Sequence, residues 1–454
     1  MATHQTKPAT EQSVPRGLLF FYGLPAVGVG YMFLFMSLFL MKFATDVLLI
    51  APAVMGAILG ASRIWDAVSD PIVGYLSDRT NSRAGRRRPW LYAAAPLIGL
   101  SFLMVFAPPD GLMGVQLSVW MGVAVFAYFT AMTVFIVPHL SLGADLTPPG
   151  HPRNRVYGAR HLSWNIGSIL ALAAMAWLLL APGEGDGATR RGAALVAIVS
   201  GLAVTSLVVL SSWYLRNFHA AQSDPGRQRA LAAYRDVWRN SHARLLLIII
   251  FIDNMGLAII SVLTLYVSEY VVGRADLAPL FILSFMIPAV VTVPLWVRLA
   301  GRFGKKPVWL LSMILAGLSF GGMFFADEGR VPLLMLLAAL AGAANGNGGA
   351  IGPSLLSDTV DFDAARTGER KEGAYFAAMT FMIKLAFGVT FLLTGLVLQW
   401  VDFIPNQPQT DSVKLALRSL YGLYPLLCYG VGALLFLGYR LREDMVTSPA
   451  HAVE

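Results

Sequence analysis

The sequence feature that most constrains the fold is a recurring run of apolar residues, each long enough to cross a lipid bilayer. A transmembrane helix needs roughly 20 predominantly apolar residues. We expect twelve such spans, at about 18–41, 51–76, 90–106, 113–140, 161–180, 193–213, 245–272, 277–300, 308–325, 331–356, 374–400 and 419–439. Only 13% of the residues are charged, whereas soluble domains have about 25%. The pattern therefore predicts an all-α membrane protein.

The longest polar interval between apolar runs follows the sixth span and predicts a boundary between two halves. We expect an N-terminal six-helix bundle at 1–213, a cytoplasmic linker at 214–244 and a C-terminal six-helix bundle at 245–454. Short motifs recur at matching places in both halves, such as Pro138-His-Leu and Pro353-Ser-Leu. Two related six-helix halves are typical of parallel-repeat transporters, whose binding site lies between the halves near the membrane midplane.

The distribution of basic residues predicts the orientation of the chain. Most of the 34 Lys and Arg residues fall on one side of the membrane if both termini lie on that side. Because Lys and Arg are enriched in cytoplasmic loops, we expect cytoplasmic termini in a multi-pass protein of the cell membrane, the inner membrane in a bacterium. A nucleic-acid-binding face would gather its basic residues on one soluble surface, so nucleic acid is not an expected partner.

The sequence shows no motif for reaction chemistry. Cys428 is the only cysteine, which excludes an internal disulfide and a metal site built from several thiolates. There is no G-x-S-x-G motif, no His/Cys cluster and no nucleotide-binding loop. The glycine-rich segment AGAANGNGGA (341–350) is not preceded by a strand, so we interpret it as a close-packing or bending segment of span ten. We expect neither an enzyme nor a cofactor.

The stretch RIWDAVSDP (63–71) places three charges inside the second apolar span. Asp66 and Asp70 are one helical turn apart and share a face. A charge at this depth costs roughly 3 kcal/mol or more unless it faces the bundle interior and finds a partner, and two neighbouring carboxylates repel each other. A bound Na⁺ or proton would relieve both penalties, and Ser69 could add an oxygen. Alternatively, Arg63 forms a purely structural ion pair, although one arginine leaves one aspartate unpaired.

Two long motifs resemble a known family of transporters. RIWDAVSDPIVGYLSDRTNSRAGRRRPW (63–90) resembles the signature of the glycoside–pentoside–hexuronide:cation symporters, a branch of the major facilitator superfamily that includes melibiose permeases. SDTVDFDAARTGERKEGAYFAAMTFMIKLAFG (357–388) resembles the C-terminal signature of that branch. The resemblance extends over essentially all the spans. It implies a major facilitator fold with two pseudo-symmetric six-helix bundles. It also implies symport of a sugar or glycoside with Na⁺ or H⁺ by alternating access.

The resemblance also implies a cation site. Asp66 and Asp70 match the two cation-binding acids of span two, and Ser69 stands where sodium-using members can have an asparagine. Thr133, five residues before Pro138, matches the hydroxyl that completes the cation site from span four. The coupling ion is the only bound ion that the resemblance implies, so Na⁺ at Asp66 and Asp70 is one candidate and a proton is the other.

Three residues are expected near the substrate. Arg160 and Lys384 match basic residues of spans five and eleven that lie near the substrate or the acids in the family. Thr380, one turn before Lys384, is expected to face the same site. Lys384 lies in the apolar run FMIKLAFG, and its long side chain could instead extend to the membrane interface. Its distance from either end of the span favours a place in the cavity.

Three further positions depart from the melibiose-type pattern. The acids that hold the sugar in those members align with Gly30 and Ile136, and the expected tryptophan aligns with Leu140. Sugar hydroxyls favour carboxylate acceptors and an aromatic platform, so these departures argue against galactosides. The animal lysophospholipid symporters are also similar to this family. A lysophospholipid-like or other anionic amphiphile is therefore the second candidate substrate class.

The loop after span two predicts a charge network. Asp78 lies close in sequence to a group of arginines that includes Arg87, and Arg63 lies earlier in the same span. We expect a clamp between helix ends that holds one gate shut; topology signalling alone is the alternative. Altogether the sequence predicts a monomeric cation-coupled symporter in the lipid bilayer. A non-transporting membrane receptor or scaffold that retains the fold is the alternative from a different class.

Overall fold

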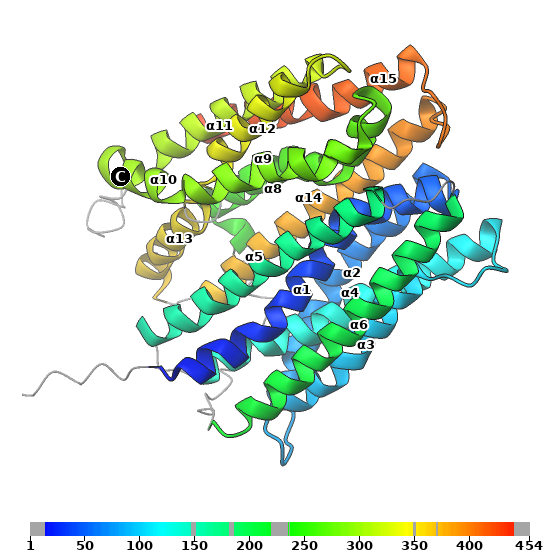
Figure 1. The fold of residues 1–454 in the computed structure, drawn as a ribbon. Coiled ribbons are helices and arrows are strands. Elements are labelled where there is room, and N and C mark those ends of the chain that lie inside the picture. Colours follow the sequence, from blue (N-terminus) through cyan, green and yellow to red (C-terminus); the bar gives the residue numbers. More distant parts are fainter. Residues whose placement is uncertain are drawn as a thin grey trace, which may run out of the picture.

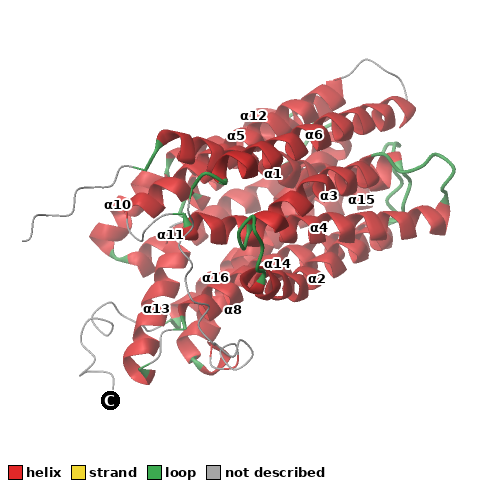
Figure 2. Cartoon of the chain, turned by 90° about the horizontal axis from the view of Figure 1, so that it is seen from below, coloured by secondary structure: helices red, strands yellow, loops and turns green. Residues whose placement is uncertain are grey.

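The computed structural model describes residues 14–146, 151–180, 186–218, 235, 237–347, 351–368 and 371–439. This part of the chain is helical and contains no strand (Figures 1 and 2). The helices of the first half are α1 (Arg16–Lys42), η1 (Phe43–Val47), α2 (Pro52–Arg79), α3 (Arg88–Phe106), α4 (Gly114–Asp145), α5 (His151–Leu180) and α6 (Asp186–Leu215).

The second half continues the series of helices. They are α8 (Ser241–Tyr266), η2 (Val267–Val271), η3 (Ala275–Leu277), α9 (Ala278–Val291), α10 (Val293–Phe303), α11 (Lys305–Gly322), η4 (Met323–Phe325), α12 (Val331–Asn345), α13 (Ile351–Thr367), α14 (Glu372–Trp400), α15 (Asp411–Arg418), η5 (Ser419–Leu423) and α16 (Tyr424–Leu437). Figure 1 shows α1–α6 grouped on one side of the molecule and α9–α12 with α15 on the other. The predicted linker 214–244 lies largely outside the described residues, and the predicted domain boundaries stay a prediction.

The predicted all-α membrane fold is confirmed, but length and composition alone do not give twelve spans. In the described ranges, nine helices are long and apolar enough to cross a bilayer. A pair bent by 43° between Ala275–Val291 and Val293–Phe303 makes ten. Two predicted spans fall outside this count. Helix α2 carries the charged residues of the second span, and span ten is broken between α12 and α13.

The break in span ten lies at the predicted glycine-rich segment. Helix α12 ends at Asn345 and α13 begins at Ile351. A Cβ atom added to Gly342 would lie 2.0 Å from the carbonyl oxygen of Phe285, and one added to Gly346 would lie 2.3 Å from Thr292 Oγ1. Both glycines are therefore required for close packing of α12 against α9, as the sequence predicts.

Helices α2 and α14 form the closest contact between the two halves. A Cβ atom at Gly56 of α2 would lie 2.7 Å from the carbonyl oxygen of Phe391, and one at Gly395 of α14 would lie 2.3 Å from that of Pro52. Small residues let helix backbones approach each other within a membrane. This contact matters for the site, since α2 carries Asp66 and Asp70 and α14 carries Lys384.

Candidate cation and substrate site

A cluster of four charged side chains joins α2 to α14. Lys384 Nζ lies 2.5 Å from Asp70 Oδ2 and 3.5 Å from Asp66 Oδ2. Arg63 Nη1 lies 3.3 Å from the same oxygen of Asp66. The two carboxylates thus face two cations, and the cluster has no formal net charge. Both sequence alternatives are present together: Arg63 pairs with Asp66, and Asp70 is paired from the opposite half of the molecule.

Asp66 and Asp70 differ in burial and in the hydrogen bonds that their carboxylate oxygens make. Only 2% of the Asp66 surface is exposed, and within the described residues its Oδ1 atom is buried without a hydrogen-bond partner. Asp70 and Lys384 are partly exposed. Buried polar atoms are rarely left unpaired, so Oδ1 of Asp66 is an oxygen suited to receive a ligand.

Thr133 completes the oxygen set from α4. Its Oγ1 atom donates a hydrogen bond of 2.8 Å to Asp70 Oδ1. The Ser69 hydroxyl instead donates to the main-chain carbonyl of Asp66 at 3.5 Å, and Ser69 does not line the cavity described below. Two carboxylates and the Thr133 hydroxyl are hard oxygen donors of the kind that alkali cations prefer. The residues present therefore fit a Na⁺ ion, and a carboxylate pair equally fits a proton.

The Arg63 side chain is more deeply buried than that of Lys384. Its guanidinium lies 3.6 Å from the centre of the Phe129 ring, a distance suited to a cation–π interaction. Its stem packs on Gly388 of α14, where an added Cβ would lie 2.8 Å from Arg63 Cβ. Arg63 is thus a buried counter-ion to Asp66, whereas the Lys384 side chain is partly exposed at the cavity.

A cavity of about 210 Å³ opens beside this cluster. Four predicted substrate residues line it: Lys384, Thr380, Ile136 and Leu140. The other lining residues are Phe33, Arg63, Asp66, Asp70, Phe129, Met132, Thr133 and Val137. Apart from Thr133 and Thr380, every polar group on this wall belongs to the charged cluster. The remainder of the wall is apolar.

Gly30 and Arg160 do not line this cavity. Gly30 lies where α1 packs on α5, and a Cβ atom there would lie 2.4 Å from the carbonyl oxygen of Trp164. The Arg160 guanidinium lies 5.7 Å from the centre of the Trp164 ring. Gly30 therefore belongs to the α1–α5 contact, and the Arg160 contact lies within α5. The predicted proximity of both residues to the substrate stays a prediction.

Sequence reasoning missed part of the apolar wall. Phe129, Met132 and Val137 belong to the same face of α4 as Thr133, and Phe33 comes from α1. Positions three, four and seven apart share a helix face. Following the helix face that carries Thr133 along α4 would have identified Phe129, Met132 and Val137. No feature of the sequence around Phe33 points to the cavity.

The predicted charge network at Asp78 and Arg87 forms within one bundle. Arg87 Nη1 pairs with Asp78 and also donates a 2.9 Å hydrogen bond to Ser77 Oγ. Its Nε atom lies 3.5 Å from Asp145 Oδ2. These contacts tie the start of α3 to the ends of α2 and α4. The clamp between helix ends is therefore present, and its predicted role in closing a gate stays a prediction.

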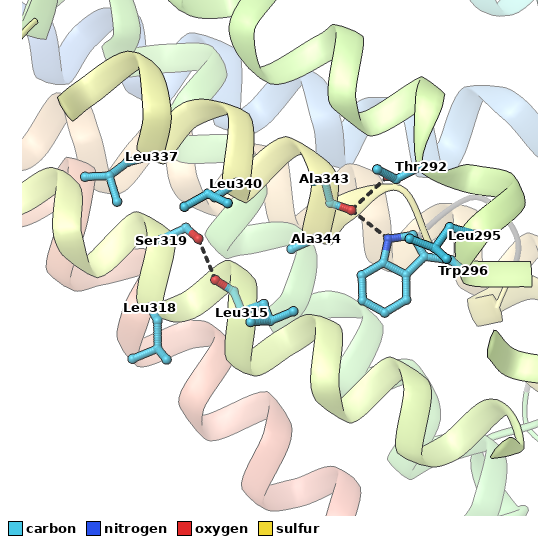
Figure 3. Close-up of a pocket in the computed structure, with 10 residues that line it drawn as sticks. All are labelled: Thr292, Leu295, Trp296, Leu315, Leu318, Ser319, Leu337, Leu340, Ala343 and Ala344. Carbon is cyan, nitrogen blue, oxygen red and sulfur yellow. Dashed lines mark hydrogen bonds between the residues drawn. The ribbon is translucent and has the colours of Figure 1, made fainter. Parts of the chain in front are cut away.

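A second cavity, of about 370 Å³, lies among α9, α10, α11 and α12 (Figure 3). Thr292 Oγ1 and Trp296 Nε1 both donate to the carbonyl oxygen of Ala343, which joins the bend between α9 and α10 to α12. The rest of the lining is mostly leucine and alanine, and Leu318 and Leu340 are exposed on the outer surface. This cavity offers no cluster of charges and is not a second candidate for the transport site.

Comparisons with known proteins agree with this geometry. Residues 21–443 match the family described as "MFS/sugar transport protein". The chain is 26% identical over 450 residues to the isoprimeverose transporter of Lactiplantibacillus pentosus, covering 97% of this chain and 92% of that one. It is 22% identical to sodium-dependent lysophosphatidylcholine symporter 1 of Xenopus tropicalis, over 90% and 84% of the two chains.

Solved structures show the same fold. The crystal structure of a D-xylose–proton symporter superposes with a TM-score of 0.65, at 15% identity, over 93% of this chain and 97% of that one. The expected major facilitator fold and the resemblance to the glycoside–pentoside–hexuronide branch are confirmed. The proteins matched are transporters and not enzymes. The chain is a multi-pass membrane protein that belongs to the MFS/sugar transport protein family.

Proposed function

We propose that this protein couples the entry of a cation, Na⁺ or H⁺, to the transport of a sugar or glycoside by alternating access. The observation that carries the proposal is the position of Lys384, which bridges Asp66 and Asp70 from the opposite half of the molecule. A lysine in that place occupies the position that a coupling cation would take between the two carboxylates. Ionisable residues inside a membrane are costly and typically mark ion or substrate pathways.

The charge balance of the cluster gives the coupling mechanism. Asp66 and Asp70 are neutralised by Arg63 and Lys384 in this structure. A Na⁺ ion bound by both carboxylates and Thr133, or a proton on Asp70, would leave one positive charge in excess. Since Arg63 is fixed by its packing, the excess is relieved when Lys384 turns its ammonium into the cavity. There the ammonium can hold an anionic or hydroxyl-bearing substrate.

Movement of Lys384 also changes the contact between the two halves. Its ion pairs with α2 hold α14 against α2, so releasing them alters the relative free energies of the conformations that open to opposite sides. A ligand shifts such an equilibrium only by the difference in its affinities for the two states. An anionic substrate at the Lys384 ammonium restores the charge balance, whereas a neutral sugar leaves the excess positive charge and is held by hydrogen bonds to the ammonium. In both cases the bound cation keeps Lys384 away from α2, which favours movement of the loaded protein.

The residues that line the cavity support a second candidate substrate class. Six of its lining residues are apolar, namely Phe33, Phe129, Met132, Ile136, Val137 and Leu140. In the described residues the wall offers no carboxylate outside the cation cluster to accept sugar hydroxyls. This wall favours a lysophospholipid-like or other anionic amphiphile, whose charged group would meet Lys384 and whose chain would lie along the apolar face of α4.

The charges of the loops support an orientation and a location in the membrane. Both termini lie in the cytoplasm, so α1 and α8 run outward and end at the outer face. The protein works as a monomer in the cell membrane, the inner membrane in a bacterium. These assignments rest on the positive-inside distribution of Lys and Arg.

The test uses purified protein in vesicles with an imposed Na⁺ or H⁺ gradient and a panel of sugars, glycosides and lysolipids. Asp66→Asn and Asp70→Asn are expected to remove gradient-driven accumulation while the protein remains folded. Asp276→Asn is the matched control, because Asp276 is a surface carboxylate paired with Arg274 away from the cavity. Concentrative uptake that survives in both cavity variants would contradict the proposal.

A further inference from the structure

A second group of polar contacts joins the two halves where α1 and α8 end. Lys42, the last residue of α1, pairs with Asp46 of η1, and its Nζ lies 2.6 Å from Glu269 Oε2 of η2. The Tyr270 hydroxyl donates to Asp46 Oδ2 at 2.5 Å. We call these four residues, Lys42, Asp46, Glu269 and Tyr270, the interbundle latch.

Neighbouring residues reinforce the latch. The hydroxyl oxygens of Thr45 and Tyr266 lie 2.7 Å apart. Asn406, between α14 and α15, donates a 2.8 Å hydrogen bond to the main-chain carbonyl of Asp46. The Lys42 ammonium lies 4.7 Å from the centre of the Tyr270 ring. One short segment of the first bundle is thus held by two separate segments of the second.

The latch is buried, which makes it sensitive to separation of the halves. Only 6% of Lys42 and 4% of Asp46 are exposed. Removing one partner from a buried charge pair leaves the other charge uncompensated. When the second bundle withdraws, Lys42 loses Glu269 and keeps only Asp46 of its own bundle, and both side chains meet water.

The backbone at the latch is irregular on both sides. Helices α1 and α8 each pass into a five-residue π-helix, η1 and η2, closed by hydrogen bonds from Leu48 to Phe43 and from Val272 to Val267. Short π-helical segments are rare and frequently occur at functional sites. Two of them meet at matching ends of the two bundles, and they carry Asp46, Glu269 and Tyr270.

The rest of the structure indicates which entrance the latch closes. The glycine contact of α2 with α14 extends from Gly388 beside Arg63 to Gly395 beside Pro52, at the end of α2 near the latch. At the other end of the helices, the Arg87–Asp78 and Lys305–Asp358 ion pairs lie within single bundles. The two halves are thus bound together on the latch side of the cation site.

We propose that the interbundle latch is the device that closes this entrance, and that Lys42 sets how readily it opens. The inference rests on the alternating access described under the proposed function. The charged contacts described above that join the halves are Lys384 with Asp66 and Asp70, and Lys42 with Glu269. Once a cation releases Lys384, the latch still resists opening toward the side where α1 and α8 end.

The test measures access to the cavity and needs neither substrate nor gradient. Cys428→Ser removes the single cysteine, and Thr380→Cys places a reporter thiol on the cavity wall. A membrane-impermeant thiol reagent is applied to each face of the membrane in turn, using right-side-out and inside-out vesicles. In this background, Lys42→Ala is expected to speed labelling on the order of tenfold from the latch side only, as expected for loss of a charged hydrogen-bonded contact.

Three companion variants make the result specific. Glu269→Gln, at a less buried side chain, is expected to act in the same direction and carries the test if Lys42→Ala does not fold. Lys42→Arg keeps the charge and is expected to label near the parent rate. Arg274→Ala is the matched control, since it breaks an exposed pair with Asp276 close to η2 without crossing between the halves.

Parent-like labelling in folded Lys42→Ala and Glu269→Gln proteins would overturn the latch. Accelerated labelling from both faces, or equal acceleration in Arg274→Ala, would also overturn it, because these results indicate general loosening. The outcome is separate from that of the symport test. Faster one-sided labelling with no cation-driven uptake would support the latch and refute the coupling.

Discussion

The cation cluster and the interbundle latch are both charged contacts between the two halves, yet they are built differently. In the cluster, Lys384 is partly exposed, Asp66 keeps an oxygen without a partner, and a cavity lies alongside. In the latch, Lys42 and Asp46 are buried, and both contact several partners. A site that exchanges a ligand needs a free donor atom and space. A contact that only opens and closes needs neither.

The largest effect is expected from Lys384→Met. This change removes the cation that pairs with both acids and that we assign to substrate binding. Gradient-driven uptake is expected to fall to background, measured in vesicles as above. The control is Lys414→Met, which removes a lysine 3.9 Å from Glu328 at a partly exposed pair in the second bundle. If coupled uptake survives in Lys384→Met, the cluster would be structural, and the contrast with the latch would disappear.

The second-largest effect is expected from a change in the packing of α14 against α2. Gly395→Val should push α14 away from Pro52, at a cost of about 1–3 kcal/mol to the conformation closed on the latch side. The reporter thiol at position 380 should then label faster from that side. Gly430→Val in α16 is the control, because no atom lies within 4 Å of an added Cβ there. Equal labelling in the two variants would show that the α2–α14 contact does not limit opening.

A smaller effect is expected from Thr133→Val. It removes a hydroxyl that contacts Asp70 but leaves both carboxylates in place. The concentration of Na⁺ needed for half-maximal uptake should rise about tenfold, the size expected for one hydrogen-bonding group. For a proton-coupled protein the Na⁺ response would be absent, and the pH dependence of uptake is measured instead. An unchanged cation dependence would remove Thr133 from the site.

The smallest effect is expected from Ser69→Ala. The Ser69 hydroxyl contacts the main-chain carbonyl of Asp66 rather than a carboxylate, so the cation dependence should change less than about twofold. The same uptake titration measures it beside Thr133→Val. A larger effect for Ser69→Ala than for Thr133→Val would reverse the oxygen set inferred from the structure.

The sequence singled out the charged residues of the candidate cation site but not those of the proposed latch, and for a physical reason. Asp66, Asp70 and Lys384 are conspicuous because charges inside apolar runs are costly, so their position alone indicates function. Lys42, Asp46 and Glu269 lie at the ends of apolar runs, where charged residues are ordinary. Only the structure shows that they contact one another and that Lys42 and Asp46 are buried.

Of the residues expected near the substrate, some line the cavity and others do not. Ile136, Leu140 and Thr380 were found through the family resemblance and do line the cavity. Gly30 and Arg160 were chosen in the same way but do not line it: Gly30 packs against α5, and Arg160 contacts Trp164 within α5. Alignment to a motif fixes where a residue lies along its helix. The tilt and rotation of that helix decide which side chains reach the cavity, and these depend on packing throughout the bundle.

The most direct test of the central claim is the cation affinity of Lys384→Ala. If Lys384 and the cation compete for Asp66 and Asp70, removing the lysine should tighten cation binding. Thermal unfolding of the purified protein, measured against Na⁺ concentration at several pH values, gives that affinity. The account predicts stabilisation by Na⁺ at a lower concentration, or by protons at a higher pH, than in the parent protein. Unchanged or weaker binding of both ions by folded Lys384→Ala protein would contradict it.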